Sequence, residues 1–168
     1  FFLFAALIGA FASESDFERI AEICLERKKY DCTEEAYVEL TRGQNENLPR
    51  LGKFQLQRNK AKVAADTFKR YFENGGLDLE AAYQYARTLD AIGNVEEASQ
   101  YYEMVLNAKP DVLQVTVIQH YVRMLMTHAR YEQAQKTIQR IRKDGTNSEM
   151  FMETEFKKIK ELISARRG

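Results

Sequence analysis

The sequence predicts an all-α fold in which antiparallel helical hairpins stack into a right-handed superhelical solenoid, closed by a carboxyl-terminal helix. Three observations lead to this prediction. The 168 residues include only two prolines and eight glycines, too few for the many tight turns of an all-β domain. Apolar residues recur at helical spacing over most of the chain. One pattern of small and large apolar residues also returns at intervals of about 34 residues.

The composition is that of a folded protein with no overall charge. Hydrophobic residues make up 45% of the chain, which argues against intrinsic disorder. The 25 basic side chains balance the 25 acidic ones, so the chain lacks the net positive charge that usually attracts nucleic acid or anionic lipid. We therefore expect no nucleic-acid partner, and a single domain or a short repeat array.

The first twelve residues, FFLFAALIGAFA, carry no charge, and polar residues begin abruptly at Ser13. Twelve apolar residues are too few for a bilayer core, which needs roughly 20. Their length matches the apolar core of an export signal, and Ala10 to Ala12 has the small-x-small pattern of a cleavage site. Residues 1–12 are therefore expected to be a signal or an amino-terminal anchor; an ordinary buried first helix is the other interpretation.

Wound as a helix, the same segment places five large apolar residues on one stripe. These are Phe1, Phe4, Leu7, Ile8 and Phe11. Their spacing is that of helices that bind in apolar grooves, so we expect the segment to occupy the groove of a neighbouring copy and to make the protein a homo-oligomer. The alternative is that it packs as an extra first helix on its own chain.

Two cysteines flank the first expected turn. Cys24 lies near the end of one helical run and Cys32 at the start of the next, which continues to residue 40. Asp31 and Glu34 form a plausible capping box for that second helix, which places the turn at residues 28–31. Residues on either side of such a turn can come within disulfide range, and an export signal indicates an oxidising compartment. The other interpretation is two small core side chains; no further ligands accompany them, so no metal site is expected.

The clearest repeat covers residues 79–110, LEAAYQYARTLDAIGNVEEASQYYEMVLNAKP. Its first helix carries packing residues Ala82, Tyr85, Ala86 and Leu89, and its second helix carries Ala98, Tyr102 and Val105. Gly93 stands at the turn and Pro110 at the end. This stretch resembles a tetratricopeptide repeat along its whole length. The cysteine spacing also resembles the disulfide-linked helical hairpins of some secreted bacterial repeat proteins.

Degenerate copies stand on both sides of this repeat. Shifting back by 34 residues matches Leu48, Leu51, Gly52, Ala64, Phe68 and Tyr71, with Asn59 at the turn and Gly76 at the end. Shifting forward by 36 matches Ile118, Tyr121, Val122, Leu125, Ala134, Ile138 and Ile141, with Ala129 at the turn. The cysteine hairpin is a shortened first unit, so about four hairpins fill residues 13–146. Residues 147–168 are expected to form a capping helix, with Phe151, Phe156, Ile159 and Ile163 toward the array and Lys157, Lys158 and Arg166 outward.

No catalytic constellation is present in the sequence. His120 and His128 are two helical turns apart, so they cannot chelate one metal as an i, i+4 pair does. The chain has no nucleophile elbow, no phosphate-binding glycine loop and no zinc-protease motif. We therefore expect neither an enzyme nor a cofactor.

The resemblance implies a concave face formed by the first helix of each hairpin. Lys53, Arg87 and Arg123 recur at matching places on these helices, and Leu56, Tyr83 and Met126 should lie beside them. A column of cations with apolar neighbours suits a peptide that bears carboxylates; three solvated side chains are the alternative. The family's chaperone-binding members use a lysine–asparagine clamp, and no asparagine accompanies these cations.

The sequence thus predicts a non-enzymatic scaffold for protein–protein interaction, exported to the bacterial periplasm or cell envelope, which binds a peptide or helix in its groove. The alternative is a membrane-anchored structural component of an envelope machine for secretion, pilus or outer-membrane assembly, with residues 1–12 as the anchor.

Overall fold

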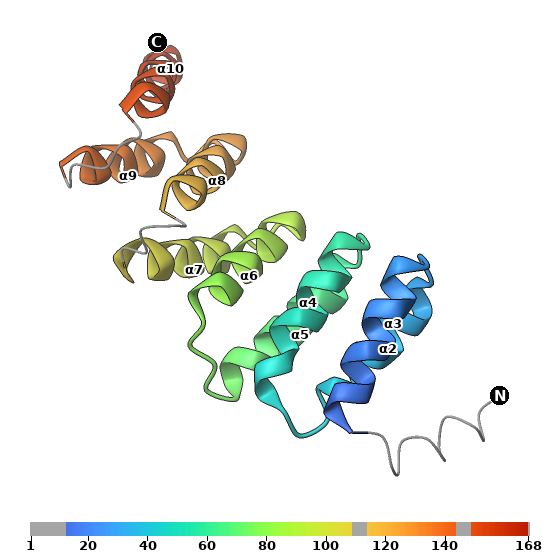
Figure 1. Cartoon of the computed structure of the whole chain (residues 1–168). Helices are drawn as coiled ribbons and strands as arrows, with labels where there is room; N and C mark the ends of the chain where they lie inside the picture. Colours follow the sequence, from blue (N-terminus) through green and yellow to red (C-terminus); the bar gives the residue numbers. More distant parts are fainter. Residues whose placement is uncertain (1–12, 109–113, 144–148, 168) are drawn as a thin grey trace. The chain divides into compact units, whose positions relative to one another are not determined.

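A computed structural model describes residues 13–108, 114–143 and 149–167 (Figure 1). In these three stretches all regular structure is helical. The chain divides into two compact units, residues 1–81 and 82–168, and the boundary falls inside helix α6. The division expected from the sequence separates the apolar segment 1–12, the hairpins of residues 13–146 and the capping helix 147–168; it stays a prediction.

The first unit holds two helical hairpins. Its elements are α2 (Glu14–Glu26), α3 (Tyr30–Leu40), the short 3-10 helix η1 (Asn45–Asn47), α4 (Leu48–Gln57) and α5 (Ala61–Glu73). Figure 1 shows α2 beside α3 and α4 beside α5. The close approach of α4 and α5 depends on Gly52, because a Cβ at this position would lie 2.8 Å from the Phe68 ring. Phe68 is fully buried, as the repeat pattern predicts.

The second unit continues the pattern. It contains most of α6 (Leu79–Ala91), followed by α7 (Val95–Ala108), α8 (Gln114–Thr127), α9 (Tyr131–Lys143) and α10 (Glu149–Arg167). Tyrosines join successive helices: the rings of Tyr85 and Tyr101 lie 4.6 Å apart between α6 and α7, and those of Tyr102 and Tyr121 stack at 5.1 Å between α7 and α8. Arg140 forms an ion pair with Glu103 at 2.7 Å, which links α9 to α7.

The carboxyl-terminal helix packs on α9, as predicted. Ile159 and Ile163 are buried, whereas Lys157 and Lys158 are exposed. This places an apolar stripe toward the array and charge toward solvent. Several predicted residues lie outside those whose side chains are described, namely Phe1, Phe4, Leu7, Ile8, Phe11, Pro110, Ile141, Phe151, Phe156 and Arg166.

The turn inside each hairpin has the same backbone conformation. Lys28, Asn59, Gly93 and Ala129 all have positive φ, between 54° and 80°, and each stands just after the first helix of its hairpin. Only Gly93 is a residue type that adopts this conformation without a steric cost. The four residues therefore mark equivalent places in the four hairpins, and the steric cost of the conformation is greatest at Lys28 and Ala129.

Replacing Ala129 with glycine should raise the free energy of unfolding by about 0.5–1 kcal/mol. The substitution removes the Cβ clash at φ 55°, and the added freedom of the unfolded chain offsets part of that gain. Urea denaturation followed by circular dichroism measures the change. Ala65→Gly is the matched control: it lies inside α5 and should lower the stability by about 1 kcal/mol. Equal effects at the two sites would contradict the strain.

The predicted capping box at Asp31 and Glu34 is wrong. Helix α3 begins at Tyr30, so Asp31 lies inside its first turn, and Lys29 takes the N-cap position without a side-chain hydrogen bond. The capping box instead stands at the start of α2. There the backbone N–H and the hydroxyl of Ser13 both donate to the Asp16 carboxylate, at 2.8 and 2.7 Å.

The predicted disulfide is confirmed. Cys24 and Cys32 are bonded, with their Cα atoms 5.9 Å apart, and the bond joins the end of α2 to the first turn of α3. Apart from Cys24, the buried side chains of this hairpin are Ala21, Thr33, Ala36 and Leu40, of which only Leu40 is large and apolar. A covalent link therefore supplements a hairpin with little apolar core of its own.

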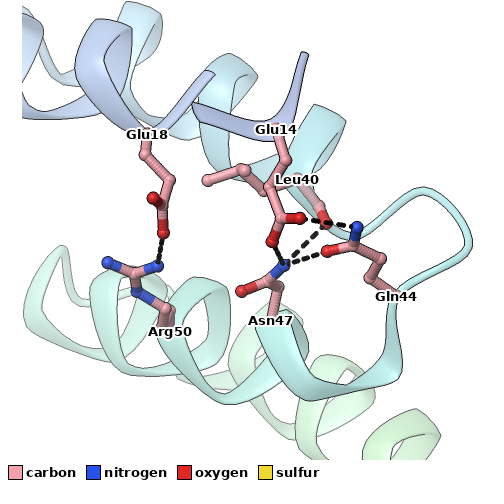
Figure 2. Close-up of polar contacts among 6 residues, drawn as sticks. All are labelled: Glu14, Glu18, Leu40, Gln44, Asn47 and Arg50. Atoms are coloured by element: carbon pink, nitrogen blue, oxygen red, sulfur yellow. Dashed lines mark hydrogen bonds and ion pairs between the residues drawn. The ribbon is translucent and has the colours of Figure 1, made fainter. Parts of the chain in front are cut away.

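A polar seam joins α2 to the second hairpin (Figure 2). The Glu14 carboxylate accepts hydrogen bonds from Gln44 at 2.9 Å and from Asn47 at 3.2 Å. Both bonds lower the pKa of Glu14, and the bond from Gln44 has the larger effect. Asn47 also donates to the Leu40 carbonyl oxygen at 3.1 Å, and Arg50 pairs with Glu18 at 2.5 Å. The seam fixes which side of α2 faces α4.

Candidate functional site

A cavity of about 280 Å³ opens in the second unit, between the first helices of its hairpins and α7. It is lined by Arg87, Asp90, Ala91, Tyr102, His120, Arg123, Met124 and Thr127. Three of these side chains are basic or can become so, and one is acidic. The cavity therefore combines positive charge with apolar and aromatic walls.

Two arginines dominate the charge of this cavity. Arg87 on α6 donates a hydrogen bond to the Gln84 side chain at 3.2 Å, and its guanidinium lies 5.7 Å from the Tyr83 ring. Arg123 on α8 is exposed. Within the described part of the chain, neither guanidinium has a carboxylate at ion-pair distance. Both are available to a ligand, and a guanidinium can hold a carboxylate through two parallel hydrogen bonds.

His120 lines the same cavity as these arginines, and Tyr83 contacts its ring. The Tyr83 hydroxyl oxygen and His120 Nδ1 lie 2.6 Å apart, and the two rings are stacked with an interplanar angle of 18°. Tyr83 itself is buried. When the tyrosine hydroxyl donates to Nδ1, the neutral imidazole carries its proton on Nε2 and can donate it to a ligand.

The surroundings of His120 favour its neutral form. Burial lowers its pKa most, followed by the positive charges of Arg87 and then Arg123; Asp90 acts in the opposite direction. Asp90 is itself engaged at the rim, where His128 Nε2 lies 3.3 Å from its carboxylate. An anion bound between the arginines would offset their repulsion and raise the pKa of His120.

The structure brings together part of the predicted site. Arg87 and Arg123 line one cavity, and the Tyr83 ring lies 5.7 Å from the Arg87 guanidinium. Lys53, exposed, and Leu56, half-buried, belong to α4 in the first unit, so their place in one column with the two arginines stays a prediction. Met126 is half-buried and does not line the cavity, whereas Met124, two residues earlier, does.

Sequence reasoning considered His120 only as a metal ligand and missed its place in the cavity. Its distance of three residues from Arg123 was the available signal, because residues three apart share a helix face. Among the described residues, no group of three or more His, Cys, Asp or Glu side chains could hold a metal ion. No helix in the same part of the chain is both long and apolar enough to cross a bilayer.

Known structures resemble this arrangement of helices although their sequences differ. A MamA crystal structure aligns over 92% of this chain and 84% of its own, with a TM-score of 0.74 and 13% identity. A tetratricopeptide repeat protein from Parabacteroides merdae aligns over 92% of this chain and 67% of its own, with a TM-score of 0.68 and 15% identity. The chain has the tetratricopeptide-repeat fold.

A further tetratricopeptide-repeat structure, YrrB, is described as having an unusual peptide-binding site. It aligns over 76% of this chain and 66% of its own, with a TM-score of 0.63 and 15% identity. No protein-family model matches the sequence, and no curated protein matches it significantly. The likeness is therefore one of fold: in tetratricopeptide-repeat terms, α2, α4, α6 and α8 are first helices and α3, α5, α7 and α9 are second helices.

Proposed function

We propose that this chain is an exported, non-catalytic scaffold that binds a carboxylate-bearing peptide or helix in the cavity of its second unit. One observation carries the proposal: Arg87 and Arg123 line the same cavity, and neither has an acidic partner in the described chain. The two guanidinium groups provide charge contacts for the carboxylates of such a peptide, beside Tyr102 and Met124 in the cavity wall.

Charge reversal at the two arginines tests this proposal. Arg87→Glu and Arg123→Glu should each weaken binding of an acidic peptide about tenfold or more, because each places a negative charge against the ligand. The probe is a labelled peptide with alternating Glu and Leu residues and a free carboxyl terminus, measured by fluorescence anisotropy. A Gln-substituted, amidated version of the peptide should bind weakly to every variant.

Lys136→Glu is the matched control. Lys136 is exposed on α9, in the same unit but outside the cavity, and its substitution changes the net charge by the same amount. Its affinity for the peptide should equal that of the wild type within about twofold. If Lys136→Glu weakens binding as much as Arg87→Glu does, the effect is one of overall charge and the cavity is not the site.

Peptide binding should become tighter as the pH falls from 8 to 5.5. The pKa of His120 is lowered in the free protein, and a bound carboxylate raises it, so protonation of His120 accompanies binding and adds a third cation to the cavity. Arg87, Arg123, Asp90 and Tyr83 are the groups that face this imidazole. Calorimetric titrations over this pH range measure the slope, which His120→Gln should flatten and His128→Gln should keep.

Export to the bacterial periplasm or cell envelope is supported by two features. Residues 1–12 match the apolar core of an export signal, and the disulfide between Cys24 and Cys32 is typical of an oxidising compartment. Mass spectrometry of the protein from an exporting cell tests this directly. A mature amino terminus at Ser13 supports a released scaffold; a retained segment supports the anchored component of an envelope machine.

Residues 1–12 are also a candidate ligand for the groove. Their apolar stripe has the spacing of groove-bound helices, and binding between copies would produce a homo-oligomer. Deleting the segment should then leave a smaller assembly that binds an added apolar helix more tightly. An unchanged assembly and an unchanged affinity would contradict self-binding through this segment.

A further inference from the structure

The first helices α4 and α8 each carry a stripe that faces the second helix of the preceding hairpin. The stripe consists of the residues 12, 8, 5 and 1 positions before the turn residue with positive φ. That turn residue is Asn59 after α4 and Ala129 after α8. Along α4 and the residues that flank it the stripe is Asn47, Leu51, Phe54 and Arg58. Along α8 and the residue that follows it the stripe is Val117, Tyr121, Met124 and His128.

On α4 and α8 the centre of this stripe is buried by the preceding helix. Phe54 is 5% exposed, and its ring lies 5.5 Å from that of Tyr37 on α3. Met124 is 2% exposed, and its neighbour on the stripe, Tyr121, stacks on Tyr102 of α7. An apolar residue at this position therefore marks a surface that packs against another helix.

On α2 the same offsets before Lys28 give Asp16, Ile20, Ile23 and Arg27. Here Ile23 is 39% exposed, where its counterparts Phe54 and Met124 are buried. No described helix covers this stripe. The first hairpin thus presents an apolar surface of the kind that is buried elsewhere in the chain.

The polar seam shows that this stripe faces away from the second hairpin. Glu14 and Glu18 point from α2 toward Asn47 and Arg50 (Figure 2). At 3.6 residues per turn, these two glutamates lie about half a turn around the helix from Ile20 and Ile23. Because the seam holds one side of α2 on the second hairpin, the stripe on the other side faces away from the described helices of that hairpin.

We propose that this stripe binds the same stripe of a second copy, with the two α2 helices antiparallel about a two-fold axis. The spacings between successive residues of the stripe are four, three and four, for Asp16, Ile20, Ile23 and Arg27. This pattern is the same when it is read in either direction. In an antiparallel pair each Ile20 therefore meets Ile23 of the other copy, and each Asp16 meets Arg27 of the other copy.

Charge complementarity selects a second copy over other occupants. Asp16 and Arg27 stand at opposite ends of the stripe, about 16 Å apart at 1.5 Å per residue, so an antiparallel partner places opposite charges together at both ends. Arg27 has no ion pair within the described chain. The apolar residues 1–12 offer no charge for either end. One helix pair makes a small interface, so we expect a dimer with a dissociation constant on the order of micromolar.

The first test is a substitution at the centre of the stripe in the full chain. Ile23→Glu should weaken dimerisation at least about tenfold, because it places two glutamates at the two-fold contact. Val63→Glu is the control: Val63 is 48% exposed on α5 of the same unit and should leave the dimer unchanged. Sedimentation equilibrium measures both, with circular dichroism to confirm that each variant is helical.

The second test separates this interface from every other mode of association. Asp16→Arg and Arg27→Asp should each be monomeric alone, because each homodimer would place like charges together at both ends. An equimolar mixture of the two variants should form a heterodimer, in which both ends again pair opposite charges. Binding of residues 1–12 in a groove predicts no such recovery.

A wild-type chain that is monomeric up to about 100 μM would overturn the proposal. So would a dimer that Ile23→Glu leaves intact, or two folded charge variants that stay monomeric when mixed. None of these outcomes bears on the cavity of the second unit, whose peptide binding is measured separately.

Discussion

Replacing Phe68 with alanine should lower the free energy of unfolding of the first unit by about 3–5 kcal/mol. Phe68 is fully buried between α4 and α5, and its ring lies against the backbone of Gly52. The missing Cβ of Gly52 lets the ring approach, so no side chain there can move in to fill the space. The substitution therefore leaves a cavity between α4 and α5.

Hydrogen exchange read by mass spectrometry is the appropriate measurement, because it resolves α4 and α5 from the helices of the second unit. Exchange in both helices should accelerate by more than a hundredfold. Val63→Ala, at a 48% exposed position of the same helix, should change it by less than about threefold. Similar effects from the two substitutions would show that Phe68 is not the packing centre.

Removing the disulfide should destabilise the first hairpin by about 2–3 kcal/mol. The bond between Cys24 and Cys32 closes a short loop, and on the chain-entropy model a loop of this size contributes about that amount. The hairpin has few other large buried side chains, so the loss is large relative to its packing. The double variant Cys24→Ser with Cys32→Ser should lose exchange protection in α2 and α3 first.

Reduction provides the control for this prediction. A thiol reductant should reproduce the change in the wild type and have no effect on the double serine variant. Exchange in α8 and α9 should stay the same in both. Undiminished protection of α2 after reduction would mean that the polar seam through Glu14 and Glu18 holds the helix without the disulfide.

The hairpin architecture was predictable because its signals are local and repeated. Small residues such as Ala64 and Ala98 recur at one position of each repeat and are fully buried there. The turns could be placed from Gly93 alone, by aligning Asn59 and Ala129 with it. The capping box at Asp31 failed because helix α3 begins two residues earlier than that box requires, a difference that propensities do not resolve.

The features that escaped prediction, in the polar seam and in the site, depend on contacts between distant residues. Glu14 meets Asn47 across 33 positions, and Tyr83 meets His120 across 37, and no local pattern encodes either pair. The exchange of Met126 for Met124 has a geometric reason. Residues two positions apart on a helix point to nearly opposite sides of it, so Met126 cannot share the face on which Met124 and Arg123 line the cavity.

The most direct test of the central claim is an NMR titration of the full chain with the acidic peptide, observing the guanidinium Nε–H groups of Arg87 and Arg123 and the ring of His120. We predict that these signals shift together with one dissociation constant, while the Lys136 amide on α9 stays in place. Saturation of the protein with peptide while all three cavity signals remain unshifted would contradict the assignment of the binding site.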